Sequence, residues 1–300
     1  MSRSKEFPRK RRSFSEARKM YPTSRDFSGK RVNEKKATLF QKESGITIFG
    51  KYPVLLALQN KSVQPSKIVI ADSLRDNQFQ VKIETLAREQ KIPMQTLPRH
   101  VLESTLKLTG ETHQGFVLLA KDFQYSSLEQ VFQKAELKNK KPLLVVLDRI
   151  QDPHNVGAII RSSVSLGADA VVFEHHGGCA ITGTIFKTSA GLVSSLPIVK
   201  VGSLRDCIIL LKKKGYQVVA LDFPAEKSLE DCSFEQPTAL IVGNEGEGIH
   251  PVLRKLASTS VEIFCPGKNQ SLNVSVATAI ALYECARQRK GVIGVGSKDL

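Results

Sequence analysis

Apolar segments of strand length alternate with helical segments from residue 143 onward, and this alternation constrains the fold more than any other feature of the sequence. Residues 143–147 are all Leu or Val, as expected of a strand buried on both faces of a parallel sheet. Residues 155–166 have the periodicity of a helix, which Gly167 ends. We therefore predict an α/β fold in which helices cover both faces of a parallel sheet.

The predicted elements form two groups. In the second half of the chain, strands are predicted at 143–147, 170–173, 197–201, 216–221, 239–242 and 261–264, and helices at 155–166, 181–193 (in part), 204–214 and from 271 onward. Upstream, strands at 46–50, 67–71 and 115–120 and helices at 53–58, 79–90 and 97–106 predict a smaller α/β domain.

These groups divide the chain into five predicted segments. They are a basic disordered arm at 1–42, the small α/β domain at 43–121, a linker at 122–141, the parallel-sheet domain at 142–292 and a tail at 293–300. The arm contains 14 Lys or Arg residues and four acidic residues, which is +10 of the net charge of +15. A basic arm usually binds a polyanion such as RNA, and a solvated solubility tail is the alternative.

The composition argues against several classes of protein. No segment approaches the roughly 18 consecutive apolar residues of a membrane-spanning helix, and the basic start of the chain lacks the apolar core of a secretory signal. The five cysteines are odd in number and form no Cys-x-x-Cys pair, which favours reduced thiols over disulfides or a zinc site. We expect a cytoplasmic protein with no membrane partner and no metal.

The loop after the first strand of the parallel sheet leads into Asn155 and Arg161. Ligands of such sheets bind outside the carboxyl ends of the strands, where this loop lies. Asn155 is a plausible N-cap of the following helix. Arg161 lies within that helix among small and apolar residues, so its charge needs an acceptor. That acceptor is either an acid of the same fold or a phosphate or ribose in a cleft.

Two further loops follow strands at the same edge. Residues 243–248 place glycines on both sides of Glu245, which suits a close backbone approach to a neutral or cationic ligand, although a plain turn explains the glycines equally well. Ser271 can cap the final helix, and capping alone accounts for it. Asn273 starts an otherwise apolar stretch and therefore needs hydrogen-bond partners.

Other polar residues give weaker hypotheses. His175 and His176 are adjacent, but no third ligand lies at a spacing that suits a metal, so a solvated loop is favoured. Asp222 follows a strand and could contact a ribose, but the glycine fingerprint of dinucleotide folds is absent.

Taken together, three motifs resemble those of the SpoU (TrmH-like) RNA ribose 2′-O-methyltransferases in order and spacing. They are Asn155-x5-Arg161, Gly243-Asn244-Glu245-Gly246-x-Gly248 and Ser271-Leu272-Asn273-Val274-Ser275. The resemblance covers residues 143–290. The upstream domain is similar to that family's L30e-like substrate-binding domain through Phe49-Gly50-x3-Val54 and His113-Gln114-Gly115.

The resemblance implies a trefoil-knotted parallel-sheet methyltransferase domain (SPOUT), S-adenosyl-L-methionine as cofactor, RNA as substrate, and a homodimer with the site near the subunit interface. The residues that match the family's site are Arg161 as the catalytic arginine, Asn155, Glu245, Ser271 and Asn273 as its companions, and Gly243, Ile263 and Leu272 as cofactor contacts. The third motif departs from the family pattern, because Ile263-Phe264-Cys265 stands where Ile-Pro-Met is usual.

The combination is most similar to the RlmB-like subfamily, which methylates a guanosine ribose of large-subunit (23S) rRNA, so rRNA is favoured over tRNA. A tRNA ribose methyltransferase and a resistance methyltransferase that acts on rRNA are alternatives on the same fold. A non-catalytic RNA-binding factor of ribosome assembly is a third alternative. The presence of Arg161 and Asn273 favours an enzyme over that factor.

Overall fold

The computed structural model describes residues 45–72, 77–106, 113–137, 140–267 and 272–290. These residues belong to the compact unit 43–300. The predicted arm and tail and the predicted site residue Ser271 lie outside the described residues.

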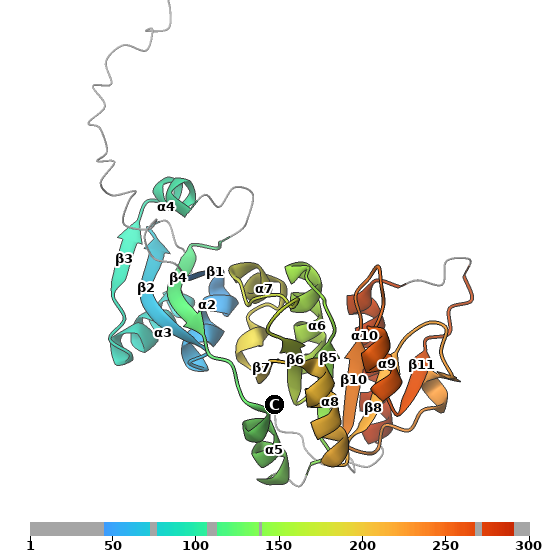
Figure 1. Ribbon diagram of the computed structural model, residues 1–300. Helices are drawn as coiled ribbons and strands as arrows, with labels where there is room; N and C mark the ends of the chain where they lie inside the picture. Colours follow the sequence, from blue (N-terminus) through green and yellow to red (C-terminus); the bar gives the residue numbers. More distant parts are fainter. Residues whose placement is uncertain (1–44, 73–76, 107–112, 138–139, 268–271, 291–300) are drawn as a thin grey trace, which may run out of the picture. The chain divides into compact units, whose positions relative to one another are not determined.

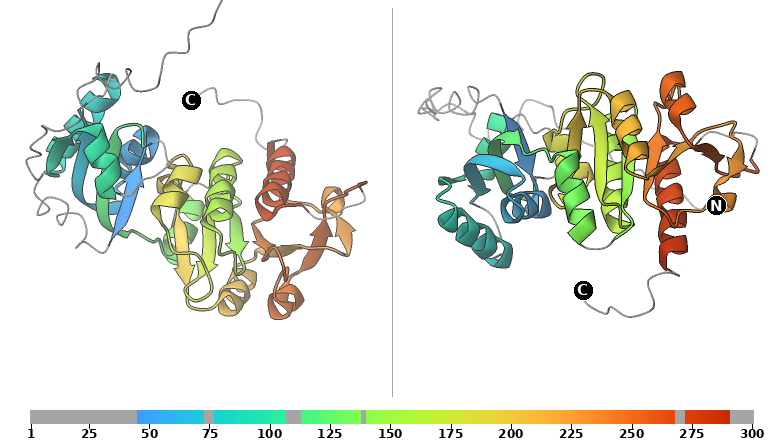
Figure 2. Two further views of the ribbon diagram at one scale, coloured as in Figure 1. Left: turned by 90° about the horizontal axis from the view of Figure 1, so that it is seen from above. Right: turned by 60° about the horizontal axis from the view of Figure 1, so that its bottom comes forward.

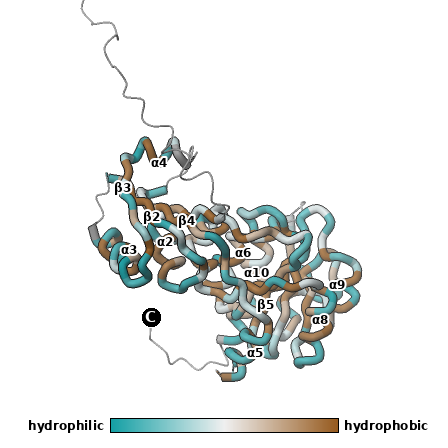
Figure 3. Tube along the Cα trace, turned by 60° about the vertical axis from the view of Figure 1, so that its left-hand side comes forward, coloured by the Kyte–Doolittle hydropathy of each residue, from teal (hydrophilic) through white to brown (hydrophobic). Residues whose placement is uncertain are grey.

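The upstream sheet has four strands in the order β1-β4-β2-β3. Its elements are β1 (Ile46–Phe49), α2 (Lys51–Gln59), β2 (Val63–Ala71), α3 (Asn77–Glu89), β3 (Met94–Leu97), α4 (Arg99–Leu106) and β4 (Phe116–Phe123). Strand β4 is antiparallel to both β1 and β2, and β3 runs parallel to β2. The sequence did not predict β3. Hydrophilic and hydrophobic residues alternate along α3, as expected of a helix with one face on a core (Figure 3).

The second sheet has seven parallel strands in the order β7-β6-β5-β10-β8-β11-β9 (Figure 1). The strands are β5 (Leu143–Leu147), β6 (Ala170–Glu174), β7 (Ile198–Val201), β8 (Gln217–Leu221), β9 (Lys227–Ser228), β10 (Thr238–Val242) and β11 (Thr259–Glu262). The α/β fold class and the parallel sheet are confirmed, with β9 as an addition. Strand β10 pairs with β5 on one side and β8 on the other, so the loops after these strands meet at one edge.

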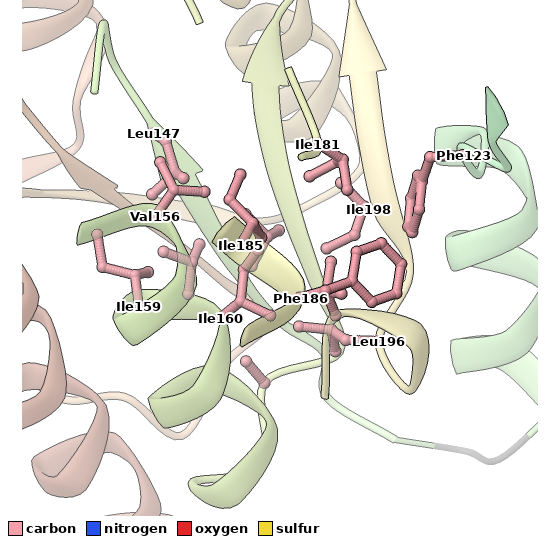
Figure 4. Close-up of a cluster of buried hydrophobic side chains, with 14 of the residues drawn as sticks. Phe123, Leu147, Val156, Ile159, Ile160, Ile181, Ile185, Phe186, Leu196 and Ile198 are labelled. Atoms are coloured by element: carbon pink, nitrogen blue, oxygen red, sulfur yellow. The ribbon is translucent and has the colours of Figure 1, made fainter. Parts of the chain in front are cut away.

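Helices cover both faces of this sheet. On one face, α5 (Leu128–Leu137), α8 (Leu204–Lys213) and α9 (Pro251–Leu256) share one apolar cluster with the strands. On the other face lie α6 (Pro153–Ser165), α7 (Gly183–Thr188) and α10 (Val274–Lys290), where side chains of α6 and α7 meet over the strands (Figure 4). Helices α6 and α10 lie side by side (Figure 2). Short 3-10 turns at Leu192–Ser194 and Leu229–Asp231 complete the elements.

Three differences from the sequence prediction concern helices. The predicted linker 122–141 contains α5, which buries Leu128, Val131 and Phe132. Helix α9 was not predicted. Helix α6 starts at residue 153, and its N-cap is Asp152, whose Oδ1 accepts a hydrogen bond from the His154 N–H at 2.9 Å. The prediction of Asn155 as N-cap is therefore wrong. Across the described ranges, no helix is both long and apolar enough to cross a membrane.

Candidate active site

Three loops at the carboxyl edge of the parallel sheet are joined by two asparagines. Asn155, in the first turn of α6, donates a hydrogen bond from Nδ2 to Glu245 Oε1 in the loop after β10. Its Oδ1 accepts a hydrogen bond from Asn273 Nδ2 at 3.1 Å. Because Asp152 caps the helix, the Asn155 side chain is free to make these contacts.

Asn273 also organises the start of α10. Its Oδ1 accepts hydrogen bonds from the Ser275 N–H at 2.9 Å, the Ser275 hydroxyl at 2.6 Å and the Val276 N–H at 3.4 Å. These are the contacts of a helix N-cap. The capping role predicted for Ser271 lies outside the described residues. One side chain therefore both caps the final helix and contacts Asn155.

A cavity of about 280 Å³ opens beside these loops. Four of the predicted site residues line it: Gly243, Glu245, Ile263 and Leu272. The structure therefore brings the three predicted cofactor contacts together, although they come from separate loops. Asp222 and Phe223, which follow β8, also line the cavity and were not predicted for it.

Gly243 has a steric reason to be glycine. The loop folds back so that the Asn244 N–H donates to Gly248 O at 3.1 Å and the Gly248 N–H donates to Asn244 O at 2.9 Å. A Cβ placed on Gly243 would lie 2.3 Å from the carbonyl carbon of Gly248, which no side chain can tolerate. The close approach of these two backbone segments forms one wall of the cavity.

Arg149 and Asp148, directly after β5, hold the same loop from the other side. The Arg149 guanidinium donates to Asp148 Oδ1 at 3.2 Å, to Glu247 and to Gly248 O at 3.3 Å. Asn244 Nδ2 donates to Arg149 O at 3.0 Å. Burial alone would lower the pKa of Arg149, but its bonds to Asp148 and Glu247 raise this pKa above its usual value. Arg149 has a φ of 56°, an uncommon conformation for a residue with a side chain.

The two unpredicted acids near the cavity have structural partners. Asp148 is 2% exposed, and its Oδ2 accepts the His250 N–H at 2.6 Å. Asp222 Oδ2 lies 3.1 Å from Arg254 Nε. The sequence signal for Asp222 was its position directly after a strand, which we discounted because the glycine fingerprint is absent.

Arg161 does not join this cluster. Its side chain is exposed on α6, and within the described part of the chain it makes no hydrogen bond or ion pair. Helical geometry places it about 9 Å along the axis from Asn155 and on another side of the helix. The expectation of an acid from the same fold is therefore not met among the described residues.

An apolar groove runs beside Arg161, between α6 and α10. It has a volume of about 440 Å³ and is lined by Ala158 and Ser162 of α6 and by Val276, Ile280 and Tyr283 of α10. The last three side chains are 48%, 38% and 61% exposed.

His175 and His176, which were predicted to lie in a solvated loop, follow β6 at the carboxyl edge of the parallel sheet. The rings of His175 and His176 stack with centroids 4.8 Å apart and are exposed to solvent. In the part of the chain that the structure describes, no group of three or more His, Cys, Asp or Glu side chains is arranged to hold a metal ion.

Two family models match this chain. The model of the SpoU rRNA Methylase family matches residues 142–283, and the model of the RNA 2′-O ribose methyltransferase substrate-binding domain matches residues 47–126. The Bacillus subtilis "Putative TrmH family tRNA/rRNA methyltransferase YacO" is 31% identical over 245 residues, which are 82% of this chain and 96% of that protein. The chain belongs to the SpoU/TrmH family of RNA methyltransferases.

Solved structures of the SpoU/TrmH fold are similar as well. The Streptomyces viridochromogenes methyltransferase AviRb in complex with AdoMet matches with a TM-score of 0.68 and 24% identity, covering 88% of this chain and 95% of that one. An AdoMet-bound rRNA methyltransferase from Sinorhizobium meliloti matches with a TM-score of 0.65 and 19% identity, covering 85% and 90%. At these identities the likeness shows the fold.

Membership of the SpoU/TrmH family confirms that the chain is an enzyme that methylates RNA, with a methyltransferase domain and an upstream substrate-binding domain. It does not separate the RlmB-like subfamily from other members, because the relatives carry names that cover both tRNA and rRNA.

Proposed function

We propose that this protein uses S-adenosyl-L-methionine to methylate a ribose 2′-hydroxyl of large-subunit rRNA, most specifically that of a guanosine. The observation that carries the proposal is the cavity lined by Gly243, Glu245 and Leu272, beside the loops that Asn155 joins by hydrogen bonds. Relatives of the same fold were crystallised with AdoMet, which supports this methyl donor.

The residues of the cavity fit this cofactor. A volume of about 280 Å³ is near the lower end, roughly 300 Å³, of small-molecule pockets. Ile263 and Leu272 offer apolar surface for a nucleoside, and the Gly243–Gly248 backbone offers polar groups without side-chain bulk. Glu245 is an acid in the lining of the cavity, which suits a sulfonium and disfavours a phosphate ligand. Gly243, Ile263 and Leu272 would hold the cofactor, largely through their backbone.

The bound cofactor supplies an electrophilic methyl group, and the protein's task is to align the ribose oxygen with it. Asn155 joins the loop of Glu245, which lines the cavity, to the loop of Asn273. We assign to Arg161 the phosphate next to the target ribose, where its planar fork can form two hydrogen bonds and polarise the 2′-hydroxyl. By its match to the third motif of the family, Ser271 would complete the set.

The preference for rRNA rests on the substrate-binding domain. Its Phe49-Gly50-x3-Val54 and His113-Gln114-Gly115 segments resemble those of the subfamily that methylates 23S rRNA. The same fold also suits a tRNA ribose methyltransferase. An RNA substrate and unpaired thiols favour a cytoplasmic location.

Methyl transfer from radiolabelled S-adenosylmethionine to unmethylated rRNA and tRNA pools tests the proposal, with the wild type beside Arg161→Ala and Arg161→Lys. We expect label in large-subunit rRNA, in nucleotides that resist alkaline hydrolysis, and loss of label in both variants. Label in tRNA would change the substrate and keep the enzyme. Near-normal turnover of Arg161→Lys would contradict the role of the fork, because an ammonium group lacks it.

A homodimer is the second part of the proposal. The groove between α6 and α10 would be covered by a second copy of the chain. As in any two-fold interface, the same surface of both copies would pack together. The exposed apolar side chains of Ile280 and Tyr283 favour such an occupant, and Arg161 lies at the rim, so an RNA phosphate could be held beside the interface. Sedimentation should give about twice the chain mass of 33.1 kDa. Ile280→Asp should yield monomers, whereas Val252→Asp, at an exposed position on α9, should leave the dimer intact.

A further inference from the structure

Two aromatic side chains meet at the surface of the substrate-binding domain. Tyr52, in the first turn of α2, is 57% exposed, and Phe79, in the first turns of α3, is partly buried against the core. Their ring centroids are 5.1 Å apart with an interplanar angle of 79°. An edge-to-face contact fixes the Tyr52 ring but cannot cover both of its faces. A large flat surface is therefore held rigid and left accessible.

Positive charge surrounds this pair. The ammonium groups of Lys51 and Lys82 lie 5.5 Å and 6.0 Å from the centroid of the Phe79 ring. Aromatic rings beside basic side chains are the combination with which proteins bind unpaired nucleic acid, because the bases stack and the phosphates are neutralised. A protein partner would have no comparable need for both features at one point.

The backbone that carries Tyr52 is fixed on two sides. The Gly50 N–H donates to Phe116 O at 3.0 Å, and the Lys51 N–H donates to Gln114 Oε1 at 3.0 Å. On the other side, a Cβ at Gly191 would lie 2.8 Å from Pro53 Cα and 3.0 Å from Tyr52 O. Gly191 directly precedes the 3-10 turn that contacts α6, the helix that carries Asn155. The backbone at Tyr52 therefore packs against the segment that contacts the active-site helix.

We propose that Tyr52, Phe79, Lys51 and Lys82 form a stacking platform for one unpaired base of the RNA substrate. This inference rests on the proposed function, in which RNA is the substrate. It adds that the RNA is bound with one base unpaired. It requires an unpaired nucleotide at a fixed distance from the methylated ribose. A target inside a continuous duplex would not satisfy it, because its bases are stacked on one another.

Binding of a fluorescein-labelled single-stranded RNA, and of the same strand in a duplex, tests the platform on the full chain. We expect Tyr52→Ala to weaken single-strand binding by about 5- to 100-fold and to leave duplex binding unchanged. Tyr52→Phe keeps the ring and should bind like the wild type. Lys82→Gln should lower the salt dependence of single-strand binding by about one phosphate contact. Val81→Ala is the matched control, because Val81 is an exposed apolar residue on α3, the helix that carries Phe79 and Lys82.

Equal single-strand affinity of Tyr52→Ala and wild type would overturn the platform, as would an equal loss for single strand and duplex. Thermal unfolding and S-adenosylmethionine binding of Tyr52→Ala should match the wild type, which excludes a folding defect. Failure of the proposed function would give a different result from failure of the platform. The wild-type protein would then bind single-stranded RNA through Tyr52 but transfer no methyl group to RNA.

Discussion

Asn155 and Asn273 connect parts of the chain that are 118 residues apart, and each uses both the nitrogen and the oxygen of its amide. Asn155 contacts Glu245 with its nitrogen and Asn273 with its oxygen. An aspartate could not donate the bond to Glu245, and an alanine would leave both neighbouring loops without this contact. The position of their loops at one edge of the predicted sheet and the resemblance to the SpoU family predicted that they belong to one site. The hydrogen bonds that join them became visible only in the structure.

Asn155→Ala should lower methyl transfer by about 10- to 100-fold, because loops that form the cavity lose their alignment. The asparagine is replaced on the surface of a stable helix, so thermal unfolding should change little. Steady-state methylation of the RNA pool measures the effect, with Asn60→Ala at the end of α2 as the control. Activity within twofold of the wild type would contradict the role of Asn155.

Arg149→Gly removes the side-chain contacts of residue 149 and keeps a residue that can adopt the same backbone conformation. Glycine accepts a φ of 56° without strain, which offsets part of the free energy of unfolding that is lost when the buried Asp148 loses its ion pair. The lost bonds to Glu247 and Gly248 should loosen the wall of the cavity and raise the KM for S-adenosylmethionine about 5- to 20-fold, with a smaller effect on kcat. Isothermal titration and steady-state kinetics give both values. An unchanged KM would show that the loop keeps its shape without Arg149.

At the scale of elements, the strands were predicted better than the connections. Leu143–Leu147 and Thr238–Val242 are buried at every position, and such runs have few alternatives to a central strand. Helix α5 was missed because its polar residues resemble a linker, although Leu128, Val131 and Phe132 have helical spacing. Strand β3 has partly exposed residues and derives its conformation from pairing with β2, which no local pattern records.

Helix α10 links the site to the far end of the sheet. Asn273 caps its start, and near its end Arg289 donates hydrogen bonds to Phe234 O, Lys141 O and Gln236 O at 2.8 to 2.9 Å. Glu284 accepts hydrogen bonds from Arg287 and Gln288, and Gln288 in turn contacts the loop before β10. The helix is therefore fixed at both ends by side chains.

Glu284→Gln should reveal part of this anchoring through its dependence on pH. The bonds from Arg287 lower the pKa of Glu284 from its usual value near 4.5. A carboxyl group whose pKa is lowered by folding stabilises the folded state at pH values above its pKa in the unfolded chain. This contribution is lost as the pH falls through the pKa of the folded state. We expect Glu284→Gln to lower Tm by roughly 1–3 °C at neutral pH, and by progressively less as the pH falls below about 4.5.

Calorimetry from about pH 3 to pH 7 measures this difference. Glu89→Gln, an exposed position on α3, is the matched control and should show no such dependence. A difference in Tm that is the same at both ends of the range would mean that the carboxylate charge does not stabilise α10.

At the scale of the whole molecule, the sequence predicted two α/β domains and the class of enzyme, because its three motifs are specific and widely spaced. It could not predict the strand order, in which β10 lies between β5 and β8, because pairing between distant segments leaves no periodic signal. Nor could it predict that Arg161 is exposed beside an apolar groove, since that depends on how α6 and α10 pack.

Removal of residues 1–42 should weaken RNA binding without changing the site. These residues carry +10 of the net charge of +15. Their removal should lower RNA affinity at least about 10-fold and reduce the slope of log affinity against log salt by about 0.7 for each phosphate that the arm neutralises. Filter binding across a salt series measures both, and cofactor affinity serves as the control. Equal affinity and equal slope would refute a role in RNA binding.

The central position of β10 has a consequence for synthesis of the chain. Its two neighbours, β5 and β8, leave the ribosome before it, so the middle of the sheet stays open until residues 238–242 have been translated. Until then both neighbours expose a row of unpaired backbone groups, which can pair with other chains. A premature stop codon upstream of β10 therefore yields an aggregation-prone fragment, and not a shortened enzyme.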